Sequence, residues 1–155
     1  MKFHCLLFCV VCSIILSCAS LKKGDGVNTL PATALQAYGR YALSQGQHLE
    51  LISSGVHFGF SFEGRECQLV AAVPNEKGHN YLQYELDGIY QKRIKVNGSA
   101  SQMIPIKAQA KGKHKVTIYK ATEAHTGDIL INKIEVIGTH TKRRAINAAR
   151  LFALH

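Results

Sequence analysis

Apolar residues alternate with polar ones along several short stretches of this chain, which is the period of a β-strand with one buried face. The alternation runs through Val56, Phe58, Phe60 and Phe62, through Leu82, Tyr84 and Leu86, and through Val116 and Ile118. Further short apolar runs occur at His48–Ile52, Leu69–Val73, Ile94–Val96, Met103–Ile106 and Ile129–Ile137. These patterns predict about eight or nine strands, with no helical period between them.

Turn-forming residues separate these stretches. They lie at Glu63–Gly64, Pro74–Gly78, Asp87–Gly88, Asn97–Gly98 and Lys111–Gly112. Strands this short, at roughly ten-residue spacing, are typical of two packed antiparallel sheets. About a hundred residues are enough for one such core and not for two. The pattern therefore predicts an all-β chain whose body, residues 38–138, is a single antiparallel β-sandwich.

The N-terminal segment has the organisation of a secretory signal. Met1-Lys2 is a short positive start, and Cys5–Leu16 is an apolar run too short to span a bilayer. Ile15-Leu16-Ser17-Cys18 has the form of a lipobox, in which the cysteine sulfur is acylated. We predict a lipoprotein signal peptide over residues 1–18, with lipid attachment at Cys18. The alternative is ordinary signal-peptidase cleavage after Ala19 or Ser20.

This leader predicts an exported protein that a lipid anchor holds on a membrane of the cell envelope, or that is otherwise periplasmic or secreted. Residues 19–37 have the composition of a tether between the leader and the sandwich. Residues 139–155 form a basic, weakly helical tail. The tail suggests either the end of a truncated gene or a native helix that docks on a partner.

Mapping the net charge of +9 argues against a nucleic-acid partner. Five of these charges lie on Lys2, Lys142, Arg143, Arg144 and Arg150, in the leader and the tail, which leaves +4 for residues 3–138. Basic residues in the body alternate with glutamates instead of clustering on one motif. We therefore expect no nucleic-acid binding.

Cysteine and histidine are arranged without a catalytic or metal-binding pattern. Four of the five cysteines lie in the signal, so Cys67 is alone in the body, within an apolar run that predicts a buried, inert thiol. The eight histidines lack the paired spacing of zinc sites. His114 shares its parity with the core residues of its strand and is expected to make a backbone hydrogen bond. His57 and Ser61 share a strand face by spacing alone. No metal or cofactor is expected.

The segment from Gly112 to Gly138, built around Thr122-Glu123-Ala124, resembles the end of a β-sandwich known from carbohydrate esterase family 2. In these acetyl esterases of plant-wall polysaccharides, the sandwich precedes the hydrolase domain. Upstream, the resemblance includes Gly39-Arg40-Tyr41, Ser54–Gly64 and Asn80–Gly88, in the same order. One departure is Ala121, where many members carry arginine. The resemblance implies a jelly-roll-like sandwich and an SGNH-type hydrolase domain as partner.

The same resemblance implies that this chain is inactive alone. The family's nucleophile is a serine on a Gly-Asp-Ser turn, whereas Gly24-Asp25 and Gly127-Asp128 are not followed by serine. No catalytic residue can therefore be assigned, and the expected function is that of a non-catalytic accessory domain of a xylan acetyl esterase, from a truncated or split gene. The alternative is a stand-alone surface lipoprotein that binds carbohydrate.

Three side chains are candidates for contact with a glycan or with the neighbouring domain. Tyr81 and Tyr119 have the parity opposite to the core residues of their strands, so their rings are expected on the outer face. Aromatic rings of this kind bind the apolar side of a pyranose, for example in acetylated plant polysaccharide. Glu123 is the carboxylate of the Thr-Glu motif and is expected in a structural turn or at the domain boundary.

Overall fold

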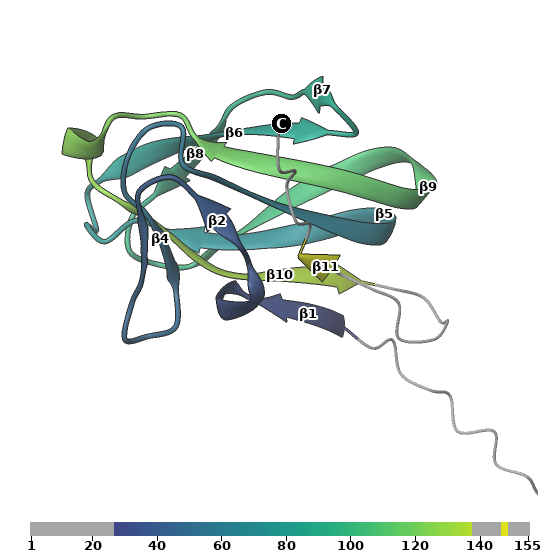
Figure 1. The fold of residues 1–155 in the computed structure, drawn as a ribbon, viewed down its shortest axis with the longest axis horizontal. Helices are drawn as coiled ribbons and strands as arrows, with labels where there is room; N and C mark the ends of the chain where they lie inside the picture. The colour runs from purple at the N-terminus through teal and green to yellow at the C-terminus, as the bar shows by residue number, and fades with distance from the viewer. Residues whose placement is uncertain (1–26, 138–146, 149–155) are drawn as a thin grey trace, which may run out of the picture.

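A computed structural model of the protein describes residues 27–137 and 147–148, and nearly all of its regular structure is β-strand (Figure 1). The strands are β1 (Val27–Pro31), β2 (Ala37–Tyr38), β3 (Tyr41–Leu43), β4 (Leu49–Leu51), β5 (His57–Ala72), β6 (His79–Leu86), β7 (Ile89–Tyr90), β8 (Ile94–Asn97), β9 (Gln102–Lys120), β10 (Ile129–Ile137) and β11 (Asn147–Ala148). Two short 3₁₀ turns accompany them, η1 (Ala32–Ala34) and η2 (Ala124–Thr126). The all-β prediction is confirmed.

All strands belong to one curled antiparallel sheet with the order β3-β4-β10-β5-β9-β6-β7. Strands β1, β2, β8 and β11 pair beside this path. The two long strands, β5 and β9, pair along most of their length and serve both halves of the sandwich. The first half of β5 lies beside the second half of β9, followed by β6. The second half of β5 lies between β9 and β10.

Two predicted turns prove to be bends within these long strands. Gly64 pairs with Gly112 and Glu66 with Lys107, so between these pairs β5 has one residue and β9 has four. A bulge of this kind bends a strand pair and strengthens its twist without ending the ladder. The expected turns at Glu63–Gly64 and Lys111–Gly112 were therefore wrong, because the glycines mark the place where the sheet curls.

The predicted turn at Asp87–Gly88 is confirmed, and it closes a hairpin between β6 and β7. Leu86 pairs with Ile89 across a two-residue connection, and both Asp87 (φ 54°) and Gly88 (φ 80°) have positive φ. This combination is that of a type I′ turn, whose twist matches the flanking strands and which favours an Asp-Gly sequence. The turn places β7 at the free edge of β6.

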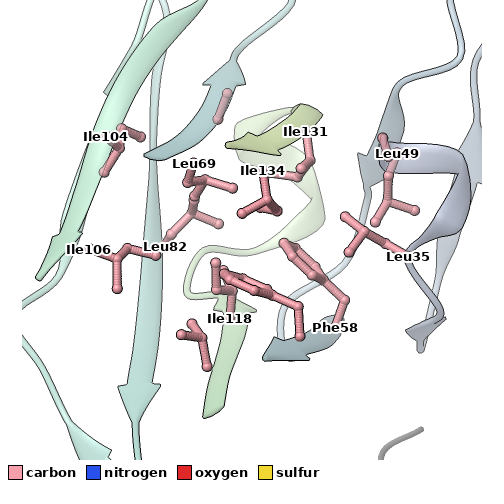
Figure 2. Close-up of a cluster of buried hydrophobic side chains, with 14 of the residues drawn as sticks. Leu35, Leu49, Phe58, Leu69, Leu82, Ile104, Ile106, Ile118, Ile131 and Ile134 are labelled. Carbon is pink, nitrogen blue, oxygen red and sulfur yellow. The ribbon is translucent and has the colours of Figure 1, made fainter. Parts of the chain in front are cut away.

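The core lies between the two halves of the curled sheet, and Figure 2 shows side chains from both halves meeting there. Phe58, Phe60 and Phe62 of β5 are buried, as their alternation predicted. Ile131 and Ile134 of β10 belong to the same cluster from the other half. Each such side chain contributes about 1.5–3 kcal/mol when it is fully buried. The aromatic residues of β5 therefore supply much of the cohesion between the halves.

The segment predicted as a tether belongs in part to the sandwich. Residues 27–31 form β1, which pairs antiparallel with β10 from Val27–Ile137 to Pro31–Lys133. Leu30, Ala32, Leu35 and Ala37 are then buried against the core. Their spacing has neither the strand nor the helix period, so the local pattern resembles a linker although each side chain has a site in the core. Residues 19–26 lie outside the described part.

The tail differs from its prediction at the two positions that the structure describes. Asn147 and Ala148 pair with Ser61 and Phe60 of β5 and form β11, whereas the sequence suggested a helix there. The backbone edge of β5 offers ladder hydrogen bonds that a short amphipathic segment cannot obtain from itself. The remainder of 139–155, the signal segment and Cys18 lie outside the described residues.

Cys67 is buried, as predicted. Burial, with a smaller contribution from the nearby Glu66 charge, raises the pKa of its thiol to about 12. A thiol that stays protonated at neutral pH is a poor nucleophile, so Cys67 acts as a small core residue. No helix within 27–137 or 147–148 is long and apolar enough to cross a membrane.

Candidate functional site

The Thr122-Glu123 motif is held by a buried lysine that the sequence analysis missed. Lys120 is 1% exposed, and its Nζ donates to the carbonyl oxygens of Ile52 (2.9 Å), Thr122 (3.1 Å) and Glu123 (2.9 Å). Burial lowers the pKa of this ammonium, whereas the carboxylates of Asp128 and Glu123 oppose that shift. The available signal was parity, because Lys120 continues the inward series of Val116 and Ile118. Because lysine is so rarely buried, this parity was not taken to place Lys120 in the core.

A buried asparagine holds the other side of the same turn. Asn80 Nδ2 donates to the carbonyl oxygen of Gly127 at 2.8 Å, and its Oδ1 accepts from the hydroxyls of Thr122 and Thr126. Asn80 and Lys120 thus connect β6 and β9 to η2. A buried polar group without a hydrogen-bond partner would destabilise the fold, and each of these hydrogen bonds supplies such a partner. The motif therefore lies in a turn that these hydrogen bonds hold in place.

Glu123 itself is exposed on this turn. Its Oε2 accepts a hydrogen bond from Ser54 Oγ at 3.2 Å, which links the turn to the loop before β5. This contact brings together two segments that the family resemblance had singled out separately. The carboxylate is accessible, and its hydrogen-bond partner is Ser54 instead of Tyr81 or Tyr119.

An aromatic row crosses the outer face of the sheet. Tyr38 of β2 stacks on His57 of β5 with ring centroids 5.5 Å apart and an interplanar angle of 18°. His57 lies 5.4 Å from Tyr119 of β9, and Tyr119 lies 6.4 Å from Tyr90 of β7. Tyr38, His57 and Tyr119 are half-buried, whereas Tyr90 is 67% exposed. We call these four side chains the aromatic row.

A carboxylate lies within the aromatic row. Glu85 of β6 pairs with Tyr90 in register, and its Oε1 accepts from the Tyr119 hydroxyl at 3.2 Å. Burial and then the Glu85 charge raise the pKa of Tyr119 to about 12, and a hydrogen bond to Glu85 raises the pKa of Tyr90. Both phenols therefore stay protonated and can donate to this carboxylate across the neutral pH range.

The structure brings Tyr81 and Tyr119 to the same face but gives them different neighbours. Gln83 of β6 pairs with Tyr119, and Tyr81 lies two residues before Gln83, so the side chains share the outer face. The Tyr81 ring makes an edge-on contact with His79 at 5.7 Å. Only Tyr119 joins the aromatic row, which the sequence analysis did not foresee because the pairing register was unknown.

Ser61 and His57, the serine and histidine candidates, are not arranged for hydrolysis. His57 and Ser61 are four residues apart on β5, which places their Cα atoms about 13 Å apart along the strand. His57 Nδ1 lies 3.0 Å from the carbonyl oxygen of Gly55, and its ring lies between two tyrosines. The described ranges also contain no group of three metal-ligating side chains. These residues therefore form no nucleophile and base pair.

His114 lies at the edge of the core, as its parity predicted, and pairs with Asp87. Its Nε2 lies 3.0 Å from the carbonyl oxygen of Ala110, and its Nδ1 lies 2.8 Å from Asp87 Oδ2. Asp87 Oδ1 accepts from the Lys115 backbone N–H at 2.8 Å. Burial opposes ionisation, but the hydrogen bonds from His114 and Lys115 together lower the pKa of Asp87.

We expect Asp87→Asn to lower stability at neutral pH and to have less effect in acid. The folded protein keeps this carboxyl ionised to lower pH than the unfolded chain does, whose pKa is about 4. The stabilisation is therefore complete above about pH 4 and is lost as pH falls through the lower folded pKa. Asparagine tolerates the positive φ, so the turn is retained. Urea unfolding at pH 7 and pH 3 tests this, and an equal difference at both pH values would contradict it.

Comparison with known proteins gives the chain a family. The carbohydrate esterase 2 N-terminal family matches residues 37–142, which is more than half of the chain. No curated protein sequence matches it. A family two carbohydrate esterase from Cellvibrio japonicus has a similar fold, with a TM-score of 0.61 and 17% identity over 74% of this chain and 34% of that one.

Two further solved structures extend the likeness. A family two esterase from Clostridium thermocellum in complex with cellohexaose gives a TM-score of 0.55 and 21% identity, over 74% of this chain and 34% of that one. The CBM36-1 domain of a xylanase from the hindgut metagenome of Trinervitermes trinervoides gives 0.62 and 11%, over 75% of this chain and 100% of that one. This chain spans about a third of each esterase. By the match over residues 37–142, the chain belongs to the carbohydrate esterase 2 N-terminal family.

Proposed function

We propose that this protein is a non-catalytic accessory domain that works beside an SGNH-type hydrolase domain in the deacetylation of polysaccharides such as xylan. The observation that carries the proposal is the family match over residues 37–142, which covers the whole described sandwich except β1 and β11. His57 and Ser61, the serine and histidine candidates on the outer face, are four residues apart on β5 and too distant to share a hydrogen bond. The hydrolase domain supplies the chemistry, and this domain supports it.

Acetate release tests this division of labour. The chain alone, a family 2 hydrolase domain alone and their mixture are given acetylated xylan and an acetylated aryl ester. We expect no release by this chain and a faster reaction on xylan in the mixture than with the hydrolase alone. Release by the chain alone would overturn the non-catalytic assignment. A mixture no faster than the hydrolase would overturn the accessory role.

The lipid anchor at Cys18 is part of the same proposal. The lipobox Ile15-Leu16-Ser17-Cys18 supports it, and acyl chains contribute about 0.8 kcal/mol per buried methylene. Cys18→Ser is expected to move the protein from the membrane fraction to the soluble fraction of a host that processes lipoproteins. Mature protein that stays soluble with Cys18 intact would instead support ordinary cleavage after Ala19 or Ser20.

A second candidate function is that of a stand-alone surface protein that binds carbohydrate. The aromatic row favours it, because rings on an outer face beside hydrogen-bonding side chains suit a pyranose. The CBM36-1 domain is similar over its whole length, and its host is a xylanase. This function needs no hydrolase partner, so the mixing experiment separates it from the first.

A further inference from the structure

We infer that the aromatic row is a glycan-binding face that takes a neutral polysaccharide strand lying across β2, β5, β9 and β7. The inference rests on the carbohydrate role proposed above, and it assigns a place and residues to it. The four rings follow one another at 5.5, 5.4 and 6.4 Å between centroids. The row therefore forms one continuous strip across the strands, with room for several successive sugar units.

The exposure of the row distinguishes it from an ordinary cross-strand ladder. Paired aromatic residues stabilise neighbouring strands wherever they face each other, and Tyr38, His57 and Tyr119 fit that role. Strand pairing does not account for Tyr90, because β7 is a two-residue strand at the free end of the sheet order. Tyr90 is also 67% exposed. Ile89 is equally exposed, but it pairs with Leu86 and therefore faces the side opposite to Tyr90. Within the row, Tyr90 is therefore the ring that is open to a ligand.

The polar groups of the row select the class of ligand. Glu85 is hydrogen-bonded to the Tyr119 hydroxyl, so its carboxylate is held in place before binding and can accept from sugar hydroxyls. Gln83 lies beside Tyr119 in the pairing register, with its amide donating to the Gln91 carbonyl oxygen. The negative charge of Glu85, between Tyr119 and Tyr90, disfavours phosphates and polyanions there. The exposed Tyr90 ring, for the apolar sugar face, and the Glu85 carboxylate, as acceptor for its hydroxyls, together suit a neutral glycan.

The test compares two side chains of similar exposure, one inside the row and one outside it. Tyr90 is 67% exposed within the row, and Met103 of β9 is 65% exposed outside it. The full chain is measured by affinity electrophoresis in soluble xylan and by titration with xylohexaose and cellohexaose. We expect Tyr90→Ala and Tyr38→Ala each to weaken binding about tenfold and Met103→Ala to leave it unchanged. Circular dichroism and thermal unfolding establish that each variant is folded.

Each result either supports the inference or overturns it. Wild-type affinity in folded Tyr90→Ala and Tyr38→Ala would overturn it, as would no binding of the wild type to any of the three glycans. If Tyr90→Ala instead abolishes stimulation of the hydrolase on the small aryl ester, the row is a domain-docking face, which also overturns it. That outcome would leave the accessory function standing. Glycan binding without any stimulation of a hydrolase would support the glycan-binding face and overturn the accessory function.

Discussion

Phe58→Ala is expected to lower the free energy of unfolding by about 3–5 kcal/mol, because it removes a ring from the centre of the core. Phe58 is 0% exposed and belongs to the cluster in which both halves of the sheet meet (Figure 2). Its strand partners, Ile118 and Ala37, are buried too, so the cavity cannot be filled by a neighbour from the surface. Small domains are stable by only about 5–15 kcal/mol. The variant is therefore expected to lie close to its unfolding threshold at 37 °C.

Urea unfolding followed by circular dichroism measures this difference. Glu63→Ala is the matched control, because Glu63 lies on the same strand and is exposed. Surface substitutions of that kind usually change stability by less than about 0.5 kcal/mol. If Phe58→Ala unfolds at the same urea concentration as Glu63→Ala, the two halves of the sheet do not share a core at this position.

Lys120→Met is expected to lower stability by about 2–4 kcal/mol, although methionine fills much of the same space. The substitution removes the donor to three carbonyl oxygens, those of Ile52, Thr122 and Glu123. Each buried acceptor left without a partner costs about 1–3 kcal/mol, less where water can enter. Glu123 is exposed, so part of this cost is recovered by hydration.

Lys113→Met on the same strand is the control, because Lys113 is exposed. Thermal unfolding of both variants separates loss of the buried network from loss of one positive charge. Proteolysis after His125 or at neighbouring residues gives a local readout, since the η2 turn is expected to open first in Lys120→Met. Equal melting temperatures for the two variants would contradict the structural role of Lys120.

The side chains of the Thr-Glu motif both have partners in the fold. Thr122 donates its hydroxyl to Asn80, and Glu123 accepts from Ser54 Oγ, whereas Lys120 contacts only backbone carbonyls of the motif. Ala121, the departure from many family members, is half-buried, and its N–H donates to the carbonyl oxygen of Tyr81. That bond is made by the backbone, so alanine satisfies it as well as arginine would.

The sequence by itself determined the properties that depend on neighbouring residues. Strand alternation placed Phe58, Phe60 and Phe62 inside, and the apolar run at Ile129–Ile137 coincides with β10. The Asp87–Gly88 turn was equally evident, because a type I′ hairpin needs residues that tolerate positive φ. The family resemblance then gave the jelly-roll-like fold. Each of these signals is local, or is shared with relatives as a pattern along the chain.

Only the tertiary structure decided the features that depend on pairing between distant segments. Whether a glycine ends a strand or bends it depends on the opposite strand, which is why Gly64 and Gly112 lie inside β5 and β9. Burial of Lys120 requires carbonyl groups from loops about seventy residues apart, which no local pattern contains. The aromatic row likewise exists because the register sets Tyr38 beside His57 and His57 beside Tyr119. A shift of one residue would have turned each of these rings to the opposite face of the sheet.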